Sequence, residues 1–311
     1  MAFSLRKSSE RGTVGLDIDG RYLAAAQVDH GRIMRGASLD LPPGLVRDGE
    51  VTDPQALGQH IKRFASVAGL PKGVRIGVAN QQIVVRVVEL PRIDDEQQRD
   101  QAVRFQAAEA IAMPLDEAVL DHQLAGYAHA PDGTPRMQVV LVAARRKMVE
   151  VLLEAVKCSG LRADGIDLDA FALVRALAAN GHGGDANATV FCHLGGVTNL
   201  AIAVGSSCVF TRPLSTVCDG DSEDVATSLA EEIRLSIDFH MAQPDARPAG
   251  DVLLSGPGAV RPGLADELGA LIGLPVSVAE PLGGLGTGAV SSDDDPYRYT
   301  IAAGLALGAS A

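Results

Sequence analysis

Two short segments of the chain combine a polar side chain with a glycine turn, a pairing that could hold a phosphate. Asp17 stands three residues before Gly20, and His193 stands two residues before Gly195 and Gly196. Glycine turns let backbone N–H groups approach an anion closely, so two such turns facing each other form a plausible phosphate clamp. The two segments differ at the position that matters most for chemistry. Asp17 in the first segment corresponds to His193 in the second.

These two segments are copies of one pattern. Residues 13–28, TVGLDIDGRYLAAAQV, return without a gap as residues 189–204, TVFCHLGGVTNLAIAV. Each copy has an apolar run, a short turn with glycine and a second apolar run, which is typical of a β-hairpin. We therefore predict a duplicated fold whose two hairpins face each other and can hold one ligand between them.

Similar elements follow both predicted hairpins. In the first half, periodicity and breakers predict a strand at 31–41, a helix at 54–70 and strands at 74–79 and 83–90. The second half is predicted to contain these elements in order: strand 207–214, helix 221–242, strand 252–254, helix 261–272, strand 275–278 and helix 299–307.

Gly256 and Gly258 lie between the predicted strand at 252–254 and the predicted helix at 261–272. A strand, a glycine turn and a helix N-terminus together present free N–H groups and the positive end of a helix dipole. This arrangement suits contact with a nucleotide.

The middle of the chain has a different order of elements. Between residues 84 and 167 the sequence predicts a strand, a helix at 94–112, strands at 119–127 and 137–144, and a helix at 145–159. We expect this stretch to be an inserted α+β module. A helix at 167–180 and a glycine-rich connection at 181–187 then lead to the second half.

Composition limits the possible functions. A chain of 311 residues with 47% hydrophobic and 21% charged residues suits two globular domains. A net charge of −12 argues against a nucleic-acid surface or adhesion to anionic lipid. We expect a cytoplasmic protein without membrane insertion, because no apolar run approaches ~20 residues and no signal peptide is evident. The four cysteines lack metal-ligand spacing and are expected to be buried thiols.

Motifs along nearly the whole chain carry a family resemblance. The turns LDIDG (16–20), HLGGVTN (193–199) and LSGPG (254–258) look like the phosphate and adenosine motifs of the actin-like ATPase superfamily. Seven further segments resemble the PilM family of type IV pilus assembly proteins: ELPRI (89–93), AVRFQAAE (102–109), MPLDEAVLD (113–121), VLVAARR (140–146), DLDAFALVRA (167–176), EEIRLSIDF (231–239) and YTIAAGLALG (299–308).

The resemblance implies an α/β fold of the actin-like (ribonuclease H-like) duplicated type, with two lobes, an inserted α+β domain 1C and a reduced 2B subdomain. It implies these boundaries: lobe 1A at 1–83, domain 1C at 84–167, a return helix and connection at 168–187, lobe 2A at 188–295 with the reduced 2B at about 213–245, and a C-terminal helix at 296–311. Subdomain 2B is expected to be small because only residues 213–230 separate Arg212 from Glu231.

The resemblance also implies a function. PilM-like proteins bind ATP between their two halves and bind the cytoplasmic N-terminal peptide of the inner-membrane protein PilN in a groove between domains 1A and 1C. The chain is therefore expected to be a cytoplasmic scaffold of a type IV pilus or a related secretion machine. A PilN-like partner would hold it at the inner face of the cell membrane, where it would meet pilus motor and platform proteins.

The resemblance implies these nucleotide-binding residues: Asp17, Gly20, His193, Gly195, Gly196, Thr198, Glu232, Gly256 and Gly258. Asp17 would also be the metal ligand, and no catalytic residue is assigned. Glu232 is either a ribose contact or a solvated helix carboxylate. His193 is either a neutral residue ending a buried strand or a direct phosphate contact.

Three departures from the family pattern bear on ATP. Asp19 replaces a glycine, Ala24 replaces a lysine, and His193 replaces the aspartate of the second motif. An added carboxylate repels phosphates, and the lost lysine removes a charge that would hold them. Because Mg²⁺ strongly prefers oxygen ligands, imidazole cannot replace the carboxylate. We therefore expect weak ATP binding, poor Mg²⁺ binding and very slow or absent hydrolysis.

Three functions remain open at this point. The first is an assembly scaffold with a degenerate ATP-binding cleft. The second is an active actin-like ATPase of the same machine, which would need Asp17 or another acid to position metal and water. The third is a small-molecule kinase of the superfamily, although no motif for its base aspartate is found. Fold alone does not separate them.

Overall fold

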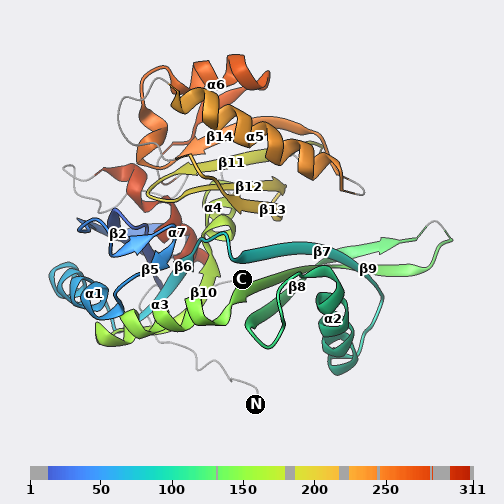
Figure 1. Ribbon diagram of the computed structural model, residues 1–311, viewed down its shortest axis with the longest axis horizontal. Coiled ribbons are helices and arrows are strands. Elements are labelled where there is room, and N and C mark those ends of the chain that lie inside the picture. Colours follow the sequence, from blue (N-terminus) through green and yellow to red (C-terminus); the bar gives the residue numbers. More distant parts are fainter. Residues whose placement is uncertain are drawn as a thin grey trace.

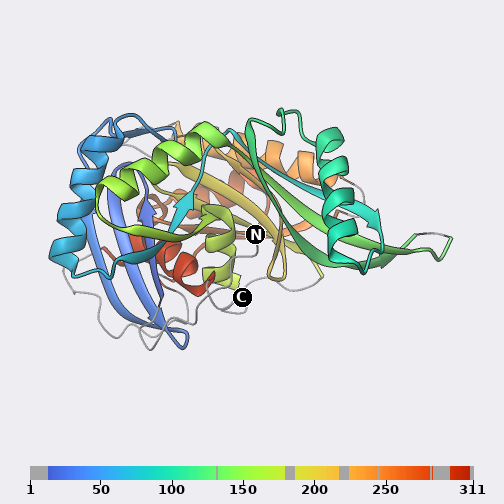
Figure 2. The ribbon, with the colours of Figure 1, turned by 90° about the horizontal axis from the view of Figure 1, so that it is seen from below.

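The computed structural model describes residues 13–130, 132–178, 186–216, 224–243, 246–280, 282 and 295–308. Two five-stranded sheets form the cores of two lobes, and a three-stranded sheet extends from the first lobe (Figure 1). Figure 2 shows this third sheet and its helix projecting beyond the lobes.

The sheet of the first lobe has the strand order β10-β6-β1-β2-β3. An antiparallel meander forms one side, from β1 (Thr13–Ile18) through β2 (Tyr22–Asp29) to β3 (Arg32–Asp40). On the other side of β1, β6 (Gly73–Val78) and β10 (Arg162–Leu168) run parallel to it. The small hairpin of β4 (Val46–Arg47) and β5 (Glu50–Val51) follows the meander.

Helices cover both faces of this sheet. Helices α1 (Pro54–Ala68) and α3 (Arg146–Cys158) pack on one face, and α7 (Thr300–Leu307) packs on the other. The start of α1 is fixed locally, because the Asp53 carboxylate accepts hydrogen bonds from two backbone N–H groups of the first turn and Pro54 follows it. Gly69, at φ 61°, ends the helix in the left-handed conformation.

The sheet of the second lobe has the order β13-β12-β11-β14-β15. Its strands are β11 (Ala188–Leu194), β12 (Thr198–Val204), β13 (Ser207–Pro213), β14 (Ala249–Ser255) and β15 (Val276–Val278). Helices α5 (Val225–Met241) and α6 (Leu264–Ile272) cover one face, and α4 (Asp169–Ala178) covers the other.

The predicted duplication is confirmed. In each lobe an antiparallel hairpin continues into a third strand, and a parallel strand pairs on the other side of the first. The two hairpins differ in register by one residue, because Asp17 pairs with Ala24 whereas His193 pairs with Asn199 rather than Leu200.

The helices α4 and α7 lie against each other between the two sheets (Figure 1). Their backbones are close, since a Cβ built at Gly304 of α7 would overlap the carbonyl oxygen of Ala172 in α4. A Cβ at Gly15 of β1 would likewise overlap the carbonyl oxygen of Ala302 in α7. The packing of this helix pair therefore joins the two lobes through small residues.

The inserted sheet has the order β7-β9-β8, with β7 at Ile83–Pro91, β8 at Ala118–His129 and β9 at Pro135–Arg145. Helix α2 (Glu96–Ala110) packs on one face of it. Strand β7 also lies beside β13, the edge strand of the second lobe (Figure 1). The inserted module therefore touches both lobes.

The range 84–167, which the sequence predicts as one module, divides in the structure. Helix α3 packs on α1, and the unexpected strand β10 pairs with β6 in the sheet of the first lobe. The helix expected from residue 261 also differs. A short 3₁₀ helix (Pro257–Val260) follows the glycine turn, and α6 begins at Leu264.

Several expected segments lie partly outside the described residues, among them the helix at 167–180, the connection at 181–187, the reduced 2B at about 213–245 and the C-terminal helix at 296–311. Within the described part of 213–245, the chain forms the end of β13, a short loop and α5. None of the helices in the described ranges combines the length and apolar character needed to cross a membrane.

Candidate functional site

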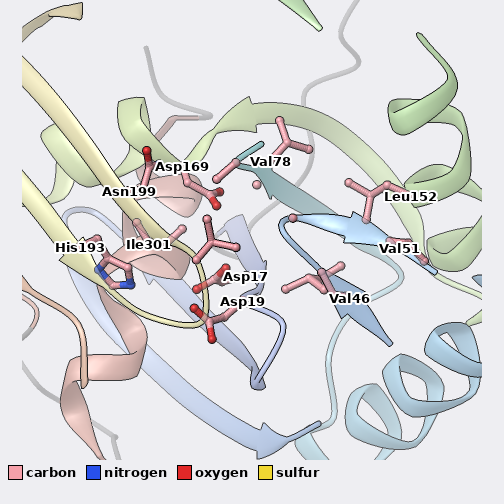
Figure 3. A pocket seen from close by; sticks show the side chains of 15 residues that line it. Asp17, Asp19, Val46, Val51, Val78, Leu152, Asp169, His193, Asn199 and Ile301 are labelled. Atoms are coloured by element: carbon pink, nitrogen blue, oxygen red, sulfur yellow. The ribbon is translucent and has the colours of Figure 1, made fainter. Parts of the chain in front are cut away.

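The two glycine turns meet across a small cavity between the lobes. Its polar lining residues are Asp17, Asp19, Asp169, His193 and Asn199 (Figure 3). The cavity leaves about 30 Å³ open to the centres of water molecules, which is enough for water to enter. Three carboxyl groups therefore share one narrow space.

Asp17 ends β1 and is almost fully buried. Its Oδ2 atom has no hydrogen-bond partner among the described residues. Burial raises the pKa of this carboxyl well above its usual value, and the nearby Asp169 and Asp19 raise it further. A cation placed beside this carboxyl would favour its charged form.

Asp169 begins α4 and faces the same cavity from the other side (Figure 3). Burial, followed by the charges of Asp19 and Asp167, raises its pKa to about 8. Gly77 in β6 makes room for it, because a Cβ there would overlap Asp169 Oδ1. Sequence reasoning missed Asp169. The available signal was an acidic residue in the first turn of a predicted helix.

Asp19 links the two turns directly. Its Oδ2 atom accepts a hydrogen bond of 2.6 Å from the backbone N–H of Gly196, and its Oδ1 atom lies 3.4 Å from the N–H of Arg21. Burial raises the pKa of Asp19 to about 6, although both hydrogen bonds lower it. A side chain of the first lobe thus occupies a backbone donor of the second.

His193 ends β11 beside the second turn and is buried. Its Nδ1 atom shares a hydrogen bond of 2.9 Å with Ser255 Oγ, whereas Nε2 has no partner among the described residues. Burial lowers its pKa to about 4, so the imidazole is neutral at neutral pH. A neutral ring adds no positive charge to offset the three carboxylates.

The predicted glycines lie close to this group of residues. Gly20 has φ 103° and lines a second hollow of about 220 Å³ next to the first, together with Gly196. Gly256 has φ 85°, and a Cβ there would lie 3.0 Å from His193 Cε1. Gly195 lies beside Asp19 and His193. Gly258 lies farther along, in the 3₁₀ helix.

Thr198 begins β12 and is buried. Its Oγ1 atom has no partner among the described residues.

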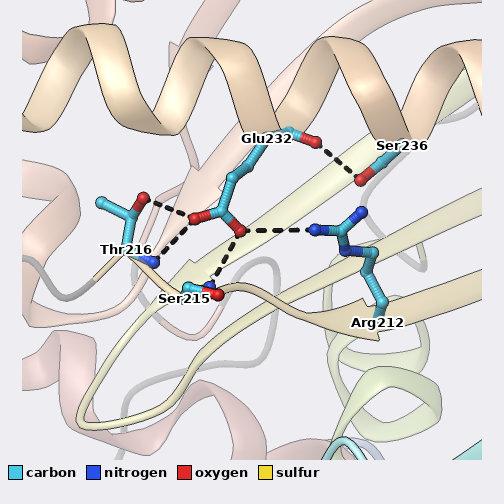
Figure 4. Close-up of polar contacts among 5 residues, drawn as sticks. All are labelled: Arg212, Ser215, Thr216, Glu232 and Ser236. Carbon is cyan, nitrogen blue, oxygen red and sulfur yellow. Dashed lines mark hydrogen bonds and ion pairs between the residues drawn. The ribbon is translucent and has the colours of Figure 1, made fainter.

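Glu232 on α5 does not line either hollow. Its carboxylate accepts hydrogen bonds from the backbone N–H of Ser215 and Thr216, both at 2.8 Å, and from Thr216 Oγ1 at 2.7 Å (Figure 4). Arg212 lies 3.5 Å away as an ion-pair partner. In this arrangement Glu232 ties α5 to the segment after β13.

Two sheets of repeated topology, with their hairpin turns facing each other across one cleft, form the actin-like duplicated fold, which solved structures share. One similar structure is titled the PilM-PilN type IV pilus biogenesis complex. It has a TM-score of 0.79 and 22% identity and covers 96% of this chain and 98% of that one. Another is the ethanolamine utilization protein EutJ from Carboxydothermus hydrogenoformans, with a TM-score of 0.52, 15% identity and coverage of 97% and 91%.

The model of the family described as type IV pilus assembly protein PilM matches residues 18–215, which is more than half of the chain. The chain belongs to this family. The sequence resemblance to PilM is thereby confirmed.

Proposed function

We propose that the chain is an assembly scaffold of a type IV pilus or a related secretion machine. It binds the cytoplasmic N-terminal peptide of a PilN-like inner-membrane protein, which holds it at the inner face of the cell membrane near the motor and platform proteins. The observation that carries this proposal is the end-to-end similarity to the PilM-PilN complex, at a TM-score of 0.79.

The inserted sheet offers a face for such a peptide. Directly paired residues of antiparallel strands point to the same side, so Val87, Val140 and Val142 share the face opposite α2. Val140 and Val142 pack against the core of the first lobe. On the same face, Val87 is 41% exposed, and Val119 on β8, which pairs with Ala144 close to the lobe, is 38% exposed. An apolar strip therefore runs from the lobe onto the open sheet.

We further propose that the interlobe cleft does not operate with Mg²⁺ and ATP, and the donor set supports this. Asp17, Asp19 and Asp169 would face the phosphates, and His193 stands where an oxygen ligand for the metal is needed. The residues present therefore do not fit the nucleotide and its metal in this arrangement.

Peptide binding tests the scaffold role. A synthetic peptide with the N-terminal cytoplasmic sequence of the PilN-like protein encoded by the same organism would be labelled and titrated with the purified chain. Val87→Asp and Val119→Asp should each weaken binding at least about tenfold, because a carboxylate on an apolar contact must be desolvated. Val67→Asp is the matched control, since Val67 is 84% exposed on α1. Failure of the natural chain to bind would contradict the proposal.

A further inference from the structure

The turns of the two lobes are bridged by one carboxylate. Asp19 lies in the turn between β1 and β2. Its carboxylate accepts a hydrogen bond of 2.6 Å from the backbone N–H of Gly196, in the turn between β11 and β12. The Asp19 residue is only 7% exposed, and together with Gly196 it lines the second hollow of about 220 Å³. The bond crosses the cleft at the point where the duplicated hairpins face each other.

The glycines of the second turn are fitted to this carboxylate. A Cβ at Gly195 would overlap Asp19 Oδ2, and a Cβ at Gly196 would lie 2.6 Å from Asp19 Oδ1. Close approach of an anion is the usual reason for glycine in a phosphate-binding turn. In this protein the anion that approaches the turn is the Asp19 carboxylate.

We propose that Asp19 is an internal competitor of phosphate. Its carboxylate occupies the backbone donor that a nucleotide phosphate would use and closes the cleft from within. This autoinhibitory contact rests on the proposed function, in which the cleft does not operate with ATP. It explains how the cleft is blocked, because the Asp19 carboxylate stands in place of a nucleotide phosphate. A phosphate that entered would have to displace Asp19 and then lie beside it.

The charges around this contact make the displacement of Asp19 by a phosphate unfavourable. Asp17 lies beside Asp19, Asp169 faces both from the other side of the cavity, and the nearby His193 is neutral (Figure 3). Arg21 and Arg298 act on Asp19 as the nearby positive groups. A displaced Asp19 carboxylate would therefore lie beside the negatively charged phosphates and two further carboxyl groups, and this repulsion would oppose phosphate entry.

Hydrogen exchange at the second turn and ATP titration without added metal test the proposal together. The variants are Asp19→Gly, which removes the side chain, and Asp19→Asn, which keeps its size without its charge. Asp29→Asn is the control, since Asp29 ends the same hairpin and its side chain is 47% exposed. Circular dichroism checks that each variant is folded.

In Asp19→Gly, exchange of the amides at 195–197 should be at least about tenfold faster, and ATP should bind at least about tenfold more tightly than to the natural chain. Asp19→Asn should lie between the two, and Asp29→Asn should match the natural chain. Unchanged exchange or unchanged ATP affinity in folded Asp19→Gly would overturn the proposal. Peptide binding is a separate measurement, so failure of the scaffold role would be seen independently.

Discussion

Gly304 of α7 lies so close to Ala172 of α4 that a Cβ at Gly304 would overlap the Ala172 carbonyl oxygen. The two helices are packed between the sheets of both lobes. Gly304→Ala should therefore lower the free energy of unfolding by about 1–3 kcal/mol, the usual range for overpacking a core.

Urea unfolding followed by circular dichroism measures this change. Gly126→Ala is the control, because a Cβ at Gly126 of β8 meets nothing within 4 Å. Equal stabilities of the two variants would show that the helices separate without cost.

A second prediction concerns Glu232, for which the structure gives a structural role. Glu232→Ala removes the acceptor of the Ser215 and Thr216 N–H groups. The free energy of unfolding should fall by about 1–2 kcal/mol, since hydrogen bonds to a charged group are lost but water can partly replace them.

Glu231→Ala, at an exposed neighbouring position on the same helix, should have little effect. A ribose-binding role would predict the reverse pattern, with normal stability and weaker nucleotide binding in any variant that binds ATP.

The pH dependence of stability reports on Asp169. Its pKa is raised from 3.8 to about 8, so the folded state holds a proton that the unfolded state has lost. This stabilising contribution is complete below pH 3.8 and is lost as the pH rises through 8. His193, with its pKa lowered to about 4, acts in the opposite sense, but only below its unfolded pKa of about 6.5.

Between pH 6.5 and 8 the free energy of unfolding of the natural chain should therefore fall by up to about 1.4 kcal/mol per pH unit for each such carboxyl. Asp169→Asn should give a shallower slope, and Asp29→Asn should not. Chemical denaturation at several pH values measures both. Parallel curves for the natural chain and Asp169→Asn would contradict the assignment.

A fourth prediction concerns metal. His193→Asp, made together with Asp19→Gly, restores an oxygen ligand opposite Asp17 and removes the carboxylate that competes with phosphate. Calorimetry should then detect ATP binding that tightens at least about tenfold when Mg²⁺ is added. The natural chain should show weak or no binding.

His193→Asn in the same Asp19→Gly background is the control. It supplies an oxygen without a charge and should show a smaller response to Mg²⁺. Tight Mg²⁺-dependent binding and steady turnover by the natural chain would contradict the proposal of an inactive cleft.

Much of the fold could be predicted from local patterns. The repeat of residues 13–28 at 189–204 predicted both hairpins, because strands buried on both faces are continuous apolar runs. Strand β10 was missed because RADGIDL is interrupted by charged residues and glycine, and its place is fixed by pairing with β6 far away in the chain. The register difference between the hairpins also depends on turn geometry that alignment of the two copies does not reveal.

The site was predicted less completely. Asp17, His193 and the two turns are brought together as expected, and Asp19 was recognised as a departure from the family pattern. Its bond to Gly196 joins residues in different halves of the chain, so no local pattern could reveal it. Asp169 joins the site only because α4 starts at the edge of the sheet.

Strand β7 leaves the first lobe and then runs beside β13 of the second. A peptide bound to the inserted sheet would therefore lie close to β13, which belongs to the second lobe. A rotation of one lobe about the α4 and α7 pair would therefore change the surface beside β7, where the proposed peptide would lie.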